Sequence, residues 1–111
     1  MSRKQLDAAD RYFDLRTANK IEEIFDYDLF TNDIVIDSFR DGIKTCKEEV
    51  KTYLTSTQPR GTWQKAEVDT DGKVVIKGNV WMIITINIIA RFYFNENGRG
   101  NKISRIELRK N

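Results

Sequence analysis

The sequence predicts an α+β fold, with three helices in the first part of the chain and an antiparallel sheet making up most of the second. Three observations support this class. Apolar residues recur at helical spacing between residues 3 and 18. Two later segments begin with residues that favour helix N-termini. After Pro59, β-branched and aromatic residues dominate and an Asp-Gly pair marks a hairpin. With 111 residues, 40% of them apolar, residues 1–111 are expected to form a single domain around one core.

The first helix is predicted over residues 3–18, where two adjacent apolar lines form one wide stripe. These lines are Leu6, Ala9 and Phe13, and Ala8, Tyr12 and Leu15. A second helix is expected from Asn19, because Glu22 completes a capping box, and it should fray near residues 31–32. Thr45 and Glu48 form a second capping box, which predicts a third helix that ends before Pro59.

The strands are predicted from runs of β-branched and aromatic residues. They cover residues 34–39, 62–68, 73 to about 83, a further strand to about 95, and 102–109. Asp71-Gly72 joins the second and third of these strands, and a glycine-rich loop at 97–101 precedes the last. The turn between the third and fourth strands lies somewhere in 82–87, where no glycine or proline marks its position.

Composition excludes several classes of function. The chain has no histidine, which removes the commonest general acid–base and the commonest metal ligand, and we expect neither a metal nor a cofactor. Its net charge of +2 argues against nucleic-acid and membrane partners. The single cysteine, Cys46, suits a reducing compartment, and the first residues lack the apolar run of a secretory signal. We therefore expect a cytoplasmic protein.

Four segments in this order resemble the nuclear transport factor 2-like superfamily, which includes ketosteroid isomerase and polyketide cyclase-like proteins. They are residues 11–19, residues 32–37, the capped third helix, and Phe92-Tyr93-Phe94 followed by the glycine loop and Lys102-Ile103. The resemblance covers nearly the whole chain. It implies a cone-shaped α+β barrel of the cystatin-like kind, in which a curved sheet wraps the first helix and leaves an apolar pocket. Because this fold carries many functions, the fold alone does not define the chemistry.

The resemblance to ketosteroid isomerase fails at the residues that matter for catalysis. Tyr12 matches the tyrosine of the first helix. The position of the base is Ser38, with Asp37 beside it, and the position of the second acid is Ala90. Isomerisation requires a base that removes a carbon-bound proton and an acid that stabilises the enolate. The sequence therefore predicts no steroid-type isomerase, and it leans against an enzyme.

Five residues are predicted to line the pocket as ligand-binding candidates: Tyr12, Asp37, Trp63, Trp81 and Arg91. Asp37 enters the pocket if Ile36 faces outward, and Arg91 would then pair with it. The alternative is a solvated acid and an exposed sheet arginine. The two tryptophans either form pocket walls or simply fill the core.

Three functional classes remain open. The first is a binding domain for a small hydrophobic ligand. The second is a lyase or isomerase using Tyr12, Asp37 and Arg91. The third is a dimeric interaction module, since residues 80–94 carry apolar residues at both even and odd positions. A sheet that is apolar on both faces needs a cover on each, which predicts a homodimer through the sheet.

Overall fold

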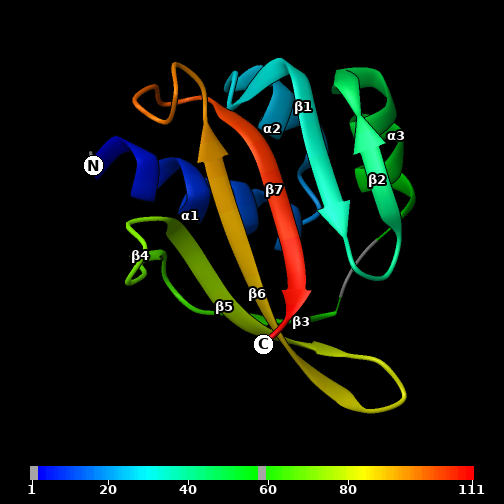
Figure 1. Ribbon diagram of the computed structural model, residues 1–111. Coiled ribbons are helices and arrows are strands. Elements are labelled where there is room, and N and C mark those ends of the chain that lie inside the picture. Colours follow the sequence, from blue (N-terminus) through cyan, green and yellow to red (C-terminus); the bar gives the residue numbers. More distant parts are fainter. Residues whose placement is uncertain (1–2, 58–59) are drawn as a thin grey trace.

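A computed structural model of the chain describes residues 3–57 and 60–111, and in these it has three helices and seven strands (Figure 1). The helices are α1 (Arg3–Thr17), α2 (Ile21–Asp26) and α3 (Cys46–Ser56). The strands are β1 (Phe30–Ser38), β2 (Gly42–Thr45), β3 (Gly61–Trp63), β4 (Glu67–Val68), β5 (Val74–Trp81), β6 (Thr85–Phe94) and β7 (Ile103–Lys110). The predicted break at Pro59 lies outside the described residues. None of the described helices has the length and apolar character needed to cross a membrane.

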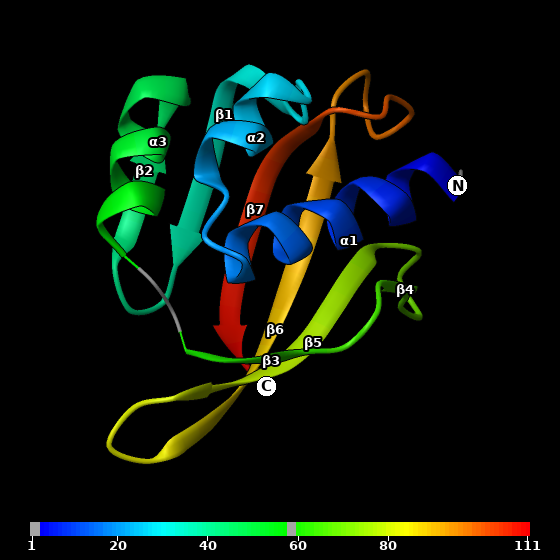
Figure 2. The same ribbon diagram turned by 180° about the vertical axis from the view of Figure 1, so that it is seen from behind.

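The strands form one curved sheet in the order β2-β1-β7-β6-β5-β3, and β4 also pairs with β5. Figures 1 and 2 show α1 lying across the concave face, with α2 and α3 beside it over β1 and β2. The predicted α+β class is confirmed, although the sheet stays open and does not close into a barrel. One pairing departs from the antiparallel prediction: β1 and β7 run parallel, because the chain crosses over through α3 and the other strands before returning beside β1.

Several element boundaries differ from the prediction. The second helix ends at Asp26, and β1 already begins at Phe30 where fraying was expected. The N-cap residue is Lys20 rather than Asn19, whose backbone is left-handed with φ 59°. Thr45 is the N-cap of α3, but its side chain makes no capping bond. The Oε1 of Glu49, not of Glu48, accepts the Thr45 backbone N–H at 3.0 Å.

The second half of the chain also contains features that the sequence did not place. The predicted strand 62–68 is interrupted and becomes β3 and β4, and the short strand β2 was not predicted at all. The turn that joins β5 and β6 falls at residues 82–84. The resulting hairpin extends well beyond the rest of the sheet (Figure 1).

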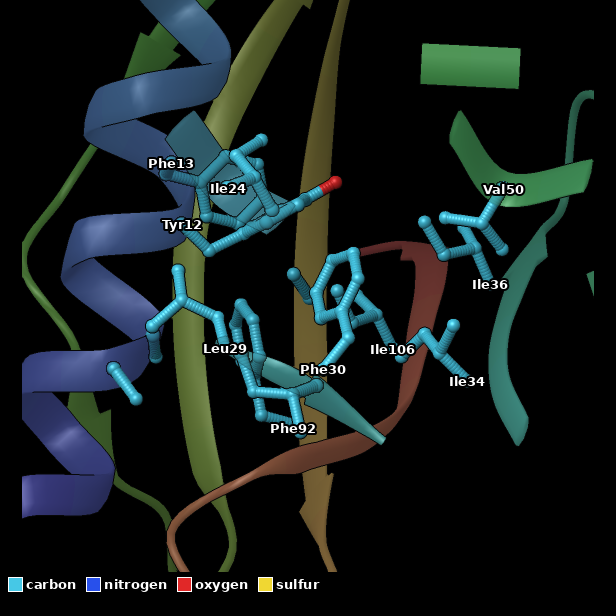
Figure 3. Packing of buried hydrophobic residues seen from close by; sticks show 14 of the residues in the cluster. Tyr12, Phe13, Ile24, Leu29, Phe30, Ile34, Ile36, Val50, Phe92 and Ile106 are labelled. Carbon is cyan, nitrogen blue, oxygen red and sulfur yellow. The ribbon is translucent and has the colours of Figure 1, made fainter. Parts of the chain in front are cut away.

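The core lies between the concave face and the helices, with aromatic rings from α1 and the sheet in mutual contact (Figure 3). Alternation along the strands sets which residues reach it. On β6, Ile88, Ala90 and Phe92 point inward, and on β1, Ile34 and Ile36 do so. The expectation of two apolar faces therefore holds only in part for the body of the sheet. The even-numbered residues of β6 from Ile88 onward fill the core, whereas on the outer face Arg91 follows the buried Ile89 and interrupts the odd-numbered line.

Exposed apolar residues gather instead at the tip of the β5–β6 hairpin. Trp81 is 55% exposed, Met82 44%, Ile83 103% and Ile84 70%. Four consecutive large side chains thus lie in solvent on this hairpin, which Figures 1 and 2 show projecting from the rest of the sheet.

Candidate functional site

A cavity of about 260 Å³ lies between the C-terminal ends of α1 and α3 and the sheet. The late residues of β1, β5 and β7 and the middle of β6 form its floor. Its lining consists of Tyr12, Phe13, Arg16, Ile36, Ser38, Phe39, Arg40, Asp41, Tyr53, Ser56, Thr57, Trp63, Val80, Ile88 and Leu108. The cavity combines apolar walls with a few converging polar groups, which is the usual composition of a small-molecule site.

An aromatic wall forms the side of the cavity between α1 and β3. The Trp63 ring stacks on Phe13 with a centroid distance of 4.1 Å and an interplanar angle of 22°. Gly78 on β5 makes room for this ring, because a Cβ there would lie 2.5 Å from Trp63 Cε3 and 2.5 Å from the Thr62 carbonyl oxygen. The Trp63 indole N–H is buried and meets no acceptor among the described residues. The Trp63 N–H is therefore an unused donor in this wall, and an unpaired buried donor costs about 1–3 kcal/mol.

Arg16 places a buried positive charge at the cavity, with only 5% of the residue exposed. Its Nη1 donates to the carbonyl oxygens of Leu54 at 2.8 Å and Thr57 at 2.9 Å. Its Nη2 donates to Thr57 Oγ1 at 3.0 Å. All three acceptors are neutral, and no carboxylate among the described residues lies within 4.0 Å of the guanidinium.

Two tyrosine hydroxyls reach the same cavity, and both stay protonated at neutral pH. Burial raises the pKa of Tyr12, and the neighbouring Arg16 opposes this shift without reversing it. Figure 3 shows the Tyr12 ring within the core and its hydroxyl pointing away from α1. Burial, together with the hydrogen bond to Asp41, raises the pKa of Tyr53 well above its ordinary value. The Tyr53 hydroxyl donates to Asp41 Oδ2 at 2.7 Å, and both phenols are therefore neutral hydrogen-bonding groups.

Of the five predicted pocket residues, Tyr12 and Trp63 line the cavity, while the other three lie elsewhere. Asp37 is on the outer face because its neighbour Ile36 is only 1% exposed and faces the core. Arg91 is on the outer face because its neighbours Ala90 and Phe92 face the core. Trp81 is on the projecting hairpin. That Tyr12 and Trp63 bind a ligand stays a prediction.

The predicted Asp37–Arg91 pair is not formed. Strand β7 separates their strands, and its Glu107 is in register with both Asp37 on β1 and Arg91 on β6. Asp37 Oδ2 instead accepts from Arg105 Nη2 and from Arg109 Nη2, each at 2.7 Å. The hydrogen bond from Arg109 is the main reason that the pKa of Asp37 lies below its ordinary value. Arg91 Nε lies 3.9 Å from Asp69 Oδ2.

The two positions that replace the acids of ketosteroid isomerase are structural. Ala90 is fully buried in the core. Ser38 Oγ accepts the backbone N–H groups of Arg40 and Asp41, each at 3.2 Å, and so supports the turn into β2. The described residues also contain no group of three or more acidic, cysteine or histidine side chains that could hold a metal ion.

Sequence reasoning missed Arg16, Asp41 and Tyr53. A signal for Arg16 was present, because it lies four residues after Tyr12 and so continues the buried stripe of the first helix. The prediction assigned Arg16 neither to the apolar stripe nor to the pocket, and neither Asp41 nor Tyr53 was predicted as a site residue. Their hydrogen bond joins α3 to the turn after β1 and has no signature in a single sequence.

No protein-family model matches the chain, and no curated protein matches it significantly. Solved structures do. A SnoaL-like protein of unknown function from Burkholderia thailandensis has a TM-score of 0.75 at 12% identity, covering 100% of this chain and 98% of that one. A nuclear transport factor 2-like protein of unknown function from Mesorhizobium loti has a TM-score of 0.74 at 13% identity, covering 99% and 93%. The Orange Carotenoid Protein of Anabaena (Nostoc), binding canthaxanthin, has a TM-score of 0.54 at 20% identity, covering 85% of this chain and 32% of that one.

These similarities define the class as an α+β domain with a curved sheet wrapped around a long N-terminal helix. More particularly, the chain has the nuclear transport factor 2-like fold, as its sequence predicted. At these identities the comparison establishes the fold and leaves the chemistry to the residues of the site.

Proposed function

We propose that this chain is a small-molecule-binding domain whose ligand occupies the cavity between α1, α3 and the sheet. The observation that carries the proposal is the cavity itself, where Tyr12, Trp63 and Leu108 meet a small set of polar groups. One structural neighbour, the Orange Carotenoid Protein, binds canthaxanthin, and this chain matches 32% of its length, which is consistent with the proposal.

The volume limits the ligand. The cavity has a volume of about 260 Å³. This is close to the lower end of ordinary ligand sites. The expected ligand is therefore compact, with one ring or a short branched chain.

A fragment screen tests the proposal. Hydrophobic fragments of this size should raise the melting temperature and change the fluorescence of Trp63, read in a Trp81→Phe background that leaves it the sole tryptophan. Val80→Phe should abolish binding, because Val80 lines the cavity and the larger ring would fill it. Asn79→Phe is the matched control, since the neighbouring residue on β5 points to the outer face. Binding that survives Val80→Phe but not Asn79→Phe would contradict the proposal.

A lyase or isomerase using Tyr12, Asp37 and Arg91 has weaker support. Tyr12 reaches the cavity from the concave side. Asp37 and Arg91 are on the convex side of the sheet, where each forms an ion pair with a different side chain. A shared reacting atom could not contact all three.

We also propose that two copies associate, with the hairpin tip at residues 81–84 as the contact. Four consecutive exposed large apolar side chains favour this surface, because monomeric proteins seldom leave such a cluster in water. Light scattering at tens of micromolar tests it, with a mass of twice 13.0 kDa expected.

A further inference from the structure

We propose that the ligand is an anion, a small cyclic carboxylic acid whose carboxylate is held by Arg16. This inference rests on the proposed function and names the chemical class that the same cavity takes.

The first step is the charge of Arg16. Arg16 is buried, and its guanidinium donates to two carbonyl oxygens and one hydroxyl and also interacts with the Tyr12 phenol, none of which carries a charge. Buried charges in proteins are ordinarily paired, because removing an ion from water is costly. Two other arginines, Arg105 and Arg109, do contact a carboxylate: they lie on the outer face and share Asp37. Arg16 has no such partner in the described part of the chain.

The second step asks what offsets that charge. The acceptors of Arg16 are at the C-terminal end of α3, where Thr57 is the C-cap. A helix C-terminus carries the equivalent of about half a negative charge. The helix end therefore stabilises Arg16 and explains its orientation, and the Tyr53 ring 5.8 Å away adds a cation–π contact, but neither carries a full negative charge. A capping role alone accounts for only part of the arrangement.

The third step is the balance across the whole cavity. Its ionised lining residues are Arg16, Arg40 and Asp41, which sum to one positive charge. Asp41 is already engaged, since its Oδ2 accepts from Tyr53 at 2.7 Å and its Oδ1 lies 3.6 Å from Arg40 Nε. The charge that remains without a carboxylate is that of Arg16. A ligand with one negative charge makes the cavity neutral.

The fourth step is the shape of the ligand. A guanidinium presents planar N–H donors that match a carboxylate. The Tyr12 phenol stays protonated beside Arg16, because burial raises its pKa, and so adds a donor rather than a competing anion. The remaining walls, which include Trp63, Ile88 and Leu108, are apolar. A ring against these walls and a carboxylate toward Arg16 would use both halves of the cavity.

The experiment compares benzoate with benzamide, which has the same shape and no charge. Isothermal titration at pH 7 and low salt should give at least tenfold tighter binding for benzoate, as expected for a charge-assisted hydrogen bond in place of a neutral one. Arg16→Met should reduce benzoate to the affinity of benzamide and leave benzamide little changed. Arg16→Lys, which keeps the charge, should restore part of the preference.

The comparison on the unmodified protein decides the inference even if Arg16→Met does not fold. Equal or tighter binding of benzamide would overturn it while leaving the pocket intact. Benzoate binding that persists in Val80→Phe would also overturn it, because the acid would then bind elsewhere. If neither compound binds at millimolar concentration the anion inference is wrong, and the fragment screen separately decides whether the cavity binds neutral molecules.

Discussion

Asp37 holds two arginines on the outer face of the sheet, whereas Arg16 lies on the inner side without a carboxylate. The outward position of Asp37 follows from strand alternation. Asp37 follows Ile36, which occupies the core, so the carboxylate points outward beside Arg105 and Arg109 from the parallel strand β7. The outer group stabilises the sheet, and the inner group is available to a ligand.

Replacing Asp37 with Asn should reduce stability by about 1 kcal/mol at pH 7, since the arginines are partly exposed and water screens the pair. The pKa of Asp37 is lowered in the folded protein, so its contribution is full above the unfolded pKa, near 4. It is lost as the pH falls through the folded pKa. Urea unfolding from pH 7 to 2 should therefore show wild type and variant converging below about pH 4.

The control for this prediction is Asp33→Asn, an exposed position on the same strand with no ion pair among the described residues. It should change stability little at pH 7. A constant difference between wild type and Asp37→Asn down to pH 2 would mean that the charge of Asp37 does not act through its arginines.

Residue identity in the site was only partly predictable. Tyr12 and Trp63 could be placed because large aromatics on a helix stripe and on a strand point inward in most arrangements. The position of Asp37 depended on which face of β1 packs against the core. A single sequence allows either face until the register of the strand is known. Arg16 follows the helical period, but it was not predicted as a site residue, because arginines are seldom fully buried. The helix end that stabilises it is supplied by a segment about 40 residues away.

At the scale of elements, β3 contacts β5 at a glycine that leaves no space for another side chain. Gly78→Ala should destabilise the protein by about 1–3 kcal/mol, because its Cβ would meet the Thr62 carbonyl oxygen and the Trp63 ring, both at 2.5 Å. The displaced ring should also alter near-ultraviolet circular dichroism and the cavity wall. Asn79→Ala, the next residue with its side chain on the other face, should have a smaller effect on both. Equal effects would show that strand β5 tolerates a methyl group at Gly78.

The elements with strong periodic or turn signals were predictable, and those set by tertiary contacts were not. The stripe of α1 and the Asp71-Gly72 hairpin are local, and the structure has both. Strand β2 has four residues and exists because it pairs with the end of β1. The turn at 82–84 lacks glycine and proline, and its position is fixed by the register of Trp81 with Thr85. Such pairings are not encoded in any one segment.

At the scale of the whole molecule, the two surfaces of the sheet have different roles. The concave face holds the core and the cavity, while ionic pairs cover much of the convex face. Of the two apolar lines that suggested a dimer through the sheet, the even-numbered one lies in the core from Ile88 onward, and association through the sheet stays a prediction. Among the described residues, four consecutive exposed apolar side chains lie on the hairpin, which extends beyond the helices (Figure 2), whereas Tyr27, Phe39, Ile43 and Val68 are exposed singly elsewhere.

The last prediction concerns this hairpin. Ile83→Asp should convert the proposed homodimer to a monomer of 13.0 kDa, measured by sedimentation or light scattering at tens of micromolar. Because Ile83 is 103% exposed, the change should leave the urea midpoint of the monomer nearly unaltered. Ile88→Asp should instead unfold the chain, since Ile88 is 2% exposed in the core. Asn32→Asp, an exposed position on β1 with the same change of charge, should keep the dimer. A monomeric wild type, or a dimer that survives Ile83→Asp, would show that the hairpin tip does not join two copies.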